Sequence, residues 1–137
     1  MLRRRVLGFL TAVPLALAKA ADPQSLRGKL VQLPDGTPVI ESAGGKRTFP
    51  SGDPDTNGVL KDKRLANMDV ELLGHFEKPE HFEVDPIHTR SIFVHQNGRR
   101  LVVTYWCDVC AIRTYTPGIC WCCQKETDLD LREPDAN

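Results

Sequence analysis

All five cysteines of this 137-residue chain lie in its C-terminal quarter, where their spacing suits metal binding. Cys107 and Cys110 form one C-x2-C pair and, after nine intervening residues, Cys120 and Cys123 form a second. Each pair can bend around one metal ion, and the intervening segment, which contains a Pro-Gly turn, is long enough to fold the second pair onto the first. The spacing therefore predicts a site with four thiolate ligands, with Cys122 as a spare or alternative ligand.

The ligand chemistry favours zinc and leaves two other metals open. Thiolates suit Zn²⁺, a borderline-soft ion that structural sites hold in a tetrahedron of four ligands. Iron in the same four-sulfur cage, or Cu(I) held by the denser group of Cys120, Cys122 and Cys123, would also match soft ligands. A closed site leaves no open position for a substrate. We therefore expect a structural, metal-handling or electron-transfer role and not a stand-alone enzyme.

The cysteines also allow a redox interpretation and a disulfide interpretation. Trp106 and the pair Cys107 and Cys110 resemble the W-C-x-x-C motif of thioredoxin-type proteins, which implies a periplasmic thiol-disulfide oxidoreductase. In that family the motif opens a helix that lowers the pKa of the first thiol, whereas here it follows a predicted β-hairpin. Alternatively, in an oxidising compartment the cysteines could form disulfides that stabilise an interaction module. An odd number of cysteines would leave one thiol unpaired.

Residues 1–20 have the pattern of an export signal. Three arginines precede a short apolar run that ends in small residues, and this predicts a signal peptide cleaved after Ala20. The pair Arg4-Arg5 also resembles a twin-arginine signal, a route that carries folded proteins. The apolar run is too short to span a bilayer. We expect a periplasmic or extracellular protein with no stable membrane anchor after cleavage.

The charge of the exported chain limits its partners. Cleavage would remove four basic residues and no acidic one, so 18 basic and 18 acidic side chains become 14 and 18. A mildly acidic protein is poorly suited to nucleic acid or anionic lipid, both of which require a basic surface. The expected partner, if there is one, is an unidentified protein.

Short strands dominate the predicted secondary structure. The clearest covers residues 68–77, where Met68, Val70, Leu72 and Phe76 alternate with polar residues and Gly74 suggests a bend or bulge. Asn97-Gly98 joins strands at 91–96 and 99–106 in a hairpin. Further strands are predicted at 26–32, 38–40 and 81–84. Residues 50–58 are predicted as a loop, and residues 59–66 as one short helix with Leu60 and Leu65 inward, ending at a left-handed Asn67.

This pattern predicts a mainly β protein with one short helix. The strands suit a small curled antiparallel sheet or a barrel of the oligonucleotide-binding (OB) type. We expect residues 21–106 to form the β-rich domain, and residues 107–137 to form a cysteine-rich metal-binding ribbon and an acidic tail. Residues 126–135 are predicted to be a solvated strand end and terminus. The fold alone would not indicate nucleic-acid binding.

Histidines and aromatic residues supply weaker candidates. His88 lies in a turn between Asp85 and Arg90, where it could act in acid–base chemistry or ligate a metal, or could simply hold the turn by hydrogen bonds. His75 and His95 are expected on the surface, and either could complete a metal site. Three aromatic residues flank the thiols and are expected to exclude water, namely Trp106, Tyr115 and Trp121. Trp121 could instead anchor an interface.

The C-terminal segment carries a family resemblance. Residues 105–127, with the pattern C-x2-C-x9-C-x-C-C, resemble the tail of small exported bacterial proteins of uncharacterised function. The resemblance implies an exported metal-binding or cysteine-rich module and adds no substrate.

Overall fold

The computed structural model describes residues 22–134, so the predicted signal peptide at 1–20 lies outside the described residues. The described chain is mainly β, as predicted, with one α-helix, α1 (Pro54–Leu60), and two 3₁₀ turns, η1 (Lys63–Leu65) and η2 (His88–Arg90). Its strands are β1 (Gln24–Gln32), β2 (Pro38–Glu41), β3 (Arg47–Ser51), β4 (Asp69–Lys78), β5 (His81–Val84), β6 (Ile92–Gln96), β7 (Arg99–Cys107), β8 (Ile112–Thr114) and β9 (Asp128–Arg132). Over this range no helix has the length and apolarity needed to cross a membrane.

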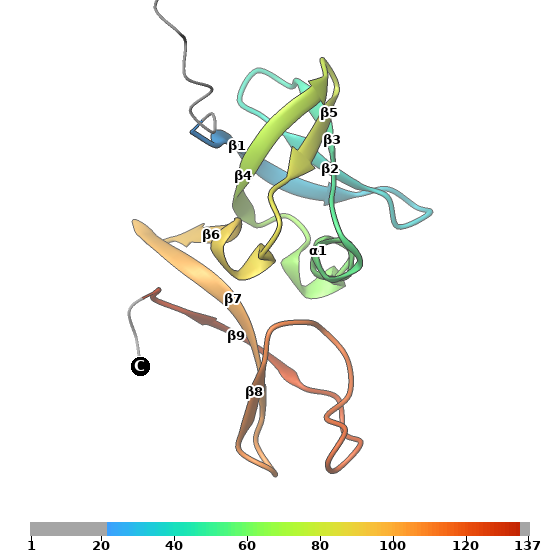
Figure 1. The fold of residues 1–137 in the computed structure, drawn as a ribbon, viewed down its shortest axis with the longest axis vertical. Helices are drawn as coiled ribbons and strands as arrows, with labels where there is room; N and C mark the ends of the chain where they lie inside the picture. The colour runs from blue at the N-terminus through green and yellow to red at the C-terminus, as the bar shows by residue number, and fades with distance from the viewer. Residues whose placement is uncertain (1–21, 135–137) are drawn as a thin grey trace, which may run out of the picture.

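The first five strands close into a barrel. They follow the order β1-β2-β3-β5-β4, and β4 then pairs with β1, so the ring has no open edge. The β3–β5 pairing is parallel and the others are antiparallel. With α1 inserted between β3 and β4, this is a barrel of the OB type, which confirms the predicted fold class. In Figure 1 the barrel occupies the upper part of the molecule, with α1 at its lower end.

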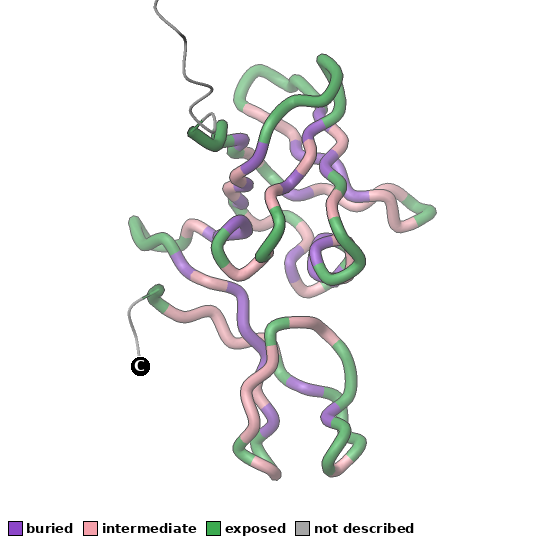
Figure 2. The backbone as a smooth tube through the Cα atoms, in the orientation of Figure 1, coloured by how far each residue is buried: buried purple, intermediate pink, exposed green. Residues whose placement is uncertain are grey.

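The core fills this barrel and continues along β7. Figure 2 shows buried positions concentrated in the barrel strands and on β7, with isolated ones in the two lower loops. Leu30, Ile40 and Phe82 come from three different barrel strands and are completely buried. Tyr105 of β7 is also completely buried and belongs to the same cluster. The barrel and the strand that leads to the cysteines therefore share one core.

Helix α1 begins earlier than predicted from the sequence. Asp53 caps α1 by accepting a hydrogen bond of 2.8 Å from the Thr56 backbone N–H, and Pro54 occupies the first turn. Val59 and Leu60 are buried at its end. The loop prediction for residues 50–58 was therefore wrong, because the capping residues outweigh the high content of turn formers. The predicted end was also wrong, because α1 ends at Leu60 and Leu65 belongs to η1. Leu60 and Leu65 are nevertheless buried as predicted, and Asn67 has the predicted left-handed conformation (φ 67°).

Strand β4 is shared between the barrel and the hairpin that carries the cysteines. Its first half pairs with β6 and its second half with β5, while β1 covers the opposite edge. The change of neighbour occurs around Gly74, and the register shift follows between Phe76 and Lys78. Phe76 was expected on the buried face but is 37% exposed, because the strand has reached the rim of the barrel there.

Gly74 offers a direct test of how closely β4 and β5 approach. A Cβ at this position would collide with the Glu83 carbonyl of β5. We expect Gly74→Ala to lower the free energy of unfolding by roughly 2 to 3 kcal/mol, as overpacking does, measured by urea denaturation. Gly58→Ala is the control, because its nearest contact would be 4.0 Å away and alanine favours a helix interior. Equal stability of Gly74→Ala and the wild type would contradict the close approach.

The predicted hairpin of β6 and β7 is confirmed. Asn97 (φ 53°) and Gly98 (φ 75°) both adopt the left-handed conformation that a type I′ turn requires. Strand β7 then extends beyond β6, so its last residues, Tyr105 to Cys107, pair with β8. In Figure 1 two loops extend from the lower end of β7, one leading to β8 and one leading to β9.

The acidic C-terminal segment is more ordered than predicted. Strand β9 pairs with β7 from Val102 to Trp106, on the edge opposite β8. Leu129 and Leu131 pack against the core, and Thr127 is buried. The expectation of a solvated strand end at residues 126–135 was therefore wrong over β9, because alternating leucines supply an apolar face that β7 buries.

Candidate metal centre

The two cysteine pairs meet at the lower end of β7. The sulfur atoms of Cys107, Cys110, Cys120 and Cys123 all lie within 4.8 Å of one another. Cys107 is the last residue of β7, and Cys110 lies in the turn that leads to β8. Cys120 and Cys123 lie in the loop that leads to β9. The structure thus brings together the four residues that the spacing predicted as ligands.

Both pairs use the same backbone turn. In the first, the Cys110 backbone N–H donates to the Cys107 sulfur at 3.4 Å, and Ala111 follows in the left-handed conformation (φ 53°). In the second, the backbone N–H groups of Cys123 and Cys122 lower the pKa of the Cys120 thiol, as N–H groups directed at its sulfur would, and Gln124 follows with φ 62°. A left-handed non-glycine residue is uncommon, so its recurrence after both pairs marks two matching knuckles. Each knuckle aims two sulfurs at the same point.

The sulfur positions fit a four-coordinate metal. Zinc–sulfur bonds of about 2.3 Å in a tetrahedron place neighbouring sulfurs about 3.8 Å apart. The Cys107 and Cys123 sulfurs are 3.5 Å apart, much farther than the ~2.05 Å of a disulfide bond. All five cysteines lie within residues 22–134 and are free thiols. The four could therefore hold a metal ion.

Two of the four cysteines are buried, and the other two face the solvent-accessible side of the cluster. Cys107 and Cys120 are 3% and 1% exposed, whereas Cys110 and Cys123 are partly exposed. Backbone N–H groups, led by that of Cys123, lower the pKa of Cys120 to about 7. The pKa of Cys110 is raised, first by hydrogen bonding with the Cys122 thiol and then by burial. The pKa of Cys107 is also raised, because burial and neighbouring thiols outweigh the Cys110 backbone N–H.

Backbone contacts hold the second knuckle in place. The Cys120 N–H donates to the Lys125 carbonyl at 2.7 Å, and the Gln124 N–H donates to the Cys120 carbonyl at 2.6 Å. Thr127 donates both its N–H and its hydroxyl to the Gly118 carbonyl, at 3.0 and 2.8 Å. The loop is thereby closed on itself at its base, next to β9.

A buried polar network joins this loop to the barrel. Asp62 precedes η1, and its side chain is only 6% exposed. Its carboxylate accepts hydrogen bonds from the Tyr105 hydroxyl at 2.7 Å and from Arg64 at 3.1 and 3.2 Å. Arg64 also donates to the Thr127 carbonyl at 2.7 Å. These residues were not predicted from the sequence, because the contacts join segments more than forty positions apart and no local pattern marks them.

The predicted histidines lie outside the sulfur cage. His88 hydrogen-bonds through Nε2 to the Tyr115 carbonyl at 2.7 Å, so it connects η2 to the segment between the knuckles. His75 is exposed and lies 3.4 Å from Asp85. The side chain of His95 is only 17% exposed and contacts Glu71 at 2.8 Å, so its predicted place on the surface was wrong. Its strand pairs with β4, which brings Glu71 beside it.

The aromatic residues around the thiols do not form one shield. Trp106 is half-buried beneath the Arg113 guanidinium, 4.8 Å from the ring centre. Tyr115 and Trp121 are 44% and 80% exposed, so neither encloses the sulfurs. The expected exclusion of water by all three was therefore wrong for these two. Their loops extend beyond the sheet that could have covered them.

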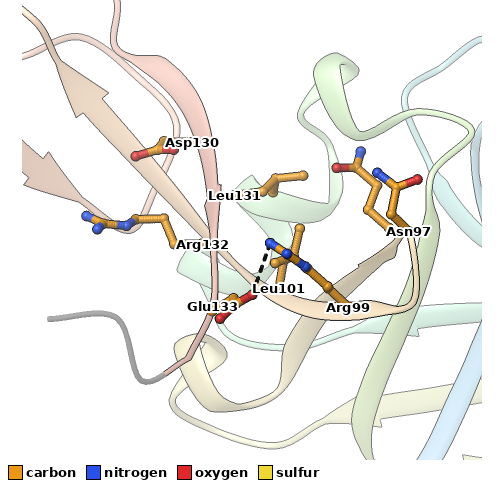
Figure 3. Close-up of a pocket in the computed structure, with 8 residues that line it drawn as sticks. Asn97, Arg99, Leu101, Asp130, Leu131, Arg132 and Glu133 are labelled. Carbon is orange, nitrogen blue, oxygen red and sulfur yellow. Dashed lines mark ion pairs between the residues drawn. The ribbon is translucent and has the colours of Figure 1, made fainter.

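A separate groove lies at the other end of β7. Figure 3 shows Leu101 and Leu131 side by side, with Arg99 and Glu133 joined by an ion pair of 3.2 Å. Asp130 and Arg132 also line this groove, and their side chains project from the side of β9 opposite to Leu131, as alternation along the strand requires. Its lining contains neither cysteine nor histidine, so the metal-binding chemistry remains with the sulfur cage.

Fold and site define an OB-type barrel that carries a four-cysteine centre on an extended strand. No family model matches this chain, and neither a curated protein nor a solved structure is similar enough to count as a match.

Proposed function

We propose that this protein is an exported metal-binding protein that holds one Zn²⁺ between Cys107, Cys110, Cys120 and Cys123. The observation that carries the proposal is the convergence of four sulfurs within 4.8 Å, presented by two knuckles of matching backbone. Thiolate ligands in a closed tetrahedral cage are typical of structural zinc. The centre would join the loop before β8 to the loop before β9 at the end of β7.

The chain's own residues prepare the site for a cation. Backbone N–H groups directed at Cys120 stabilise its thiolate, which is the form that binds a metal. The turns hold the remaining sulfurs close enough to repel one another once ionised, and a divalent ion would relieve that repulsion. Iron or Cu(I) would use the same ligands, so the identity of the metal is part of the test.

The redox interpretation has weaker support. A thiol that attacks disulfides needs an accessible sulfur and a lowered pKa. Cys107, the first residue of the W-C-x-x-C segment, is 3% exposed and its pKa is raised. These properties favour metal binding over thiol-disulfide exchange at this pair.

We also propose that the protein acts in the periplasm or outside the cell, with a protein partner. The proposal for export rests on residues 1–20 and on the resemblance of the tail to small exported proteins. Trp121 is 80% exposed beside the metal centre, as suits an indole that anchors an interface.

Elemental analysis and thiol counting on the full chain, purified from its compartment after export, test this function. We expect about one zinc ion per chain and no disulfide, as a closed four-thiolate site requires. Exposed Cys122 should react with a thiol reagent in the loaded protein, and removal of the metal with a chelator should make the other four thiols react as well. A metal-free protein that contains two disulfides would contradict the proposal. One iron or copper ion per chain would support the four-cysteine site but show that its metal is not zinc.

A further inference from the structure

The matching knuckles reveal what is unusual about Cys122. In each knuckle two residues separate the ligands, namely Asp108 and Val109 in the first and Trp121 and Cys122 in the second. Cys122 thus occupies the position that Val109 occupies in the first knuckle. Both residues are exposed. The second knuckle therefore presents a thiol to solvent where the first presents an apolar side chain.

This fifth thiol lies on the open side of the cage. Cys107 and Cys120 are sealed, so a metal ion could be approached only past Cys110 and Cys123. Cys122 is exposed and directly precedes Cys123, one of these two outer ligands, in the chain. Its thiol is also the first cause of the raised pKa of Cys110, the other outer ligand. A soft donor atom thus lies next to the outer ligands at the accessible side of the cage.

We infer that Cys122 is the exchange thiol through which a soft metal ion enters and leaves the four-cysteine centre. The inference rests on the proposed metal-binding function and assigns its metal-transfer step. A bond forms between the Cys122 sulfur and the metal while the bond from the Cys110 sulfur breaks. The Cys122 thiol gives up a proton as it binds, and Cys110 takes up one, so no oxidation state changes.

Exchange of Cys110 for Cys122 affects the rate of metal transfer and does not alter the ligands of the resting site. In the resting state the four cage sulfurs fill the tetrahedron, so Cys122 contributes no bond to the bound ion. During transfer the metal is held by the two inner sulfurs, Cys123 and Cys122, while Cys110 is free. A donor atom from an incoming chelator or carrier protein would then displace the Cys122 sulfur, the ligand nearest to solvent, and that sulfur would take up a proton as it leaves. Without Cys122 the ion must lose a ligand before any replacement is present.

Zinc transfer to the chromophoric chelator 4-(2-pyridylazo)resorcinol tests the inference on the full exported chain. We expect Cys122→Ser to retain the wild-type zinc content and to transfer zinc at least about tenfold more slowly, as loss of one metal–sulfur bond from the transition state implies. Val109→Ser is the matched control at the equivalent position, and its transfer rate should equal that of the wild type. Val109→Cys, added to Cys122→Ser, should restore fast zinc transfer, because it places an exposed thiol at the equivalent position of the first knuckle.

The outcomes separate this inference from the proposed function. Equal transfer rates in Cys122→Ser and the wild type, both loaded with zinc, would overturn the exchange role and leave the metal site standing. Loss of zinc from Cys122→Ser would also overturn it, since Cys122 would then be a resting ligand. Absence of metal from the wild type itself would refute the proposed function.

Discussion

Replacement of Cys120 by serine is expected to abolish tight zinc binding and to unfold both cysteine loops. Structural zinc sites contribute apparent binding free energies of about 10 to 16 kcal/mol at neutral pH, and this energy supports the fold around them. Cys120 is the most buried of the four clustered cysteines, at 1% exposure, and a serine hydroxyl there would be a poor ligand for a soft metal ion. The variant should therefore contain far less than one zinc ion per chain.

The barrel should survive this loss, because its hydrogen-bonded ring closes without the cysteines. Strands β1 to β5 pair around the full circle, and β9 is held to β7 by its own pairing and by two leucines. Amide hydrogen exchange should show lost protection over residues 107–127 and retained protection in β1 and β4. Cys122→Ser is the control and should keep both zinc and protection. Full protection of the loops in a zinc-free Cys120→Ser protein would show that they fold without metal.

The second large effect is expected at Asp62, which links the barrel to the cysteine loops. In Asp62→Asn the carboxylate that accepts hydrogen bonds from Tyr105 and Arg64 is replaced by an amide that can accept at only one atom. Breaking a buried charged pair in this way costs roughly 3 kcal/mol, measured as the free energy of unfolding in urea at neutral pH. Asp69→Asn is the matched control, because its pair with Arg27 is about half exposed and worth less than about 1 kcal/mol.

The loss of stability in Asp62→Asn is expected to depend on pH. Burial raises the pKa of Asp62, but hydrogen bonds from Arg64 and Tyr105 outweigh burial, so the folded pKa lies below the usual value. As the pH falls, Asp62 is therefore protonated in the unfolded chain before it is protonated in the folded chain. The stabilisation that Asp62 contributes is present above about pH 4 and is lost as the pH falls through its folded pKa. The difference in stability between the wild type and Asp62→Asn should narrow in acid. A difference that stayed constant down to pH 2 would contradict the assigned network.

Local patterns were sufficient for several parts of the fold. Asn97-Gly98 determined the β6–β7 hairpin because only residues that tolerate positive φ fit its turn. Alternation in β4 predicted the burial of Val70 and Leu72, which are completely buried. The start of helix α1 was predicted wrongly, because Asp53 and Pro54, which cap and begin it, are residue types that also form turns.

By itself the sequence determined which residues can serve as metal ligands, because C-x2-C spacing requires only a local turn and both knuckles make the same one. Tertiary structure alone decided that the two knuckles meet, since β7 carries β8 on one edge and β9 on the other. It also decided that Cys107 and Cys120 face inward while Cys122 stays exposed, and that Asp62 meets Tyr105. Burial and long-range contacts depend on how strands distant in the chain pair, which no local pattern specifies.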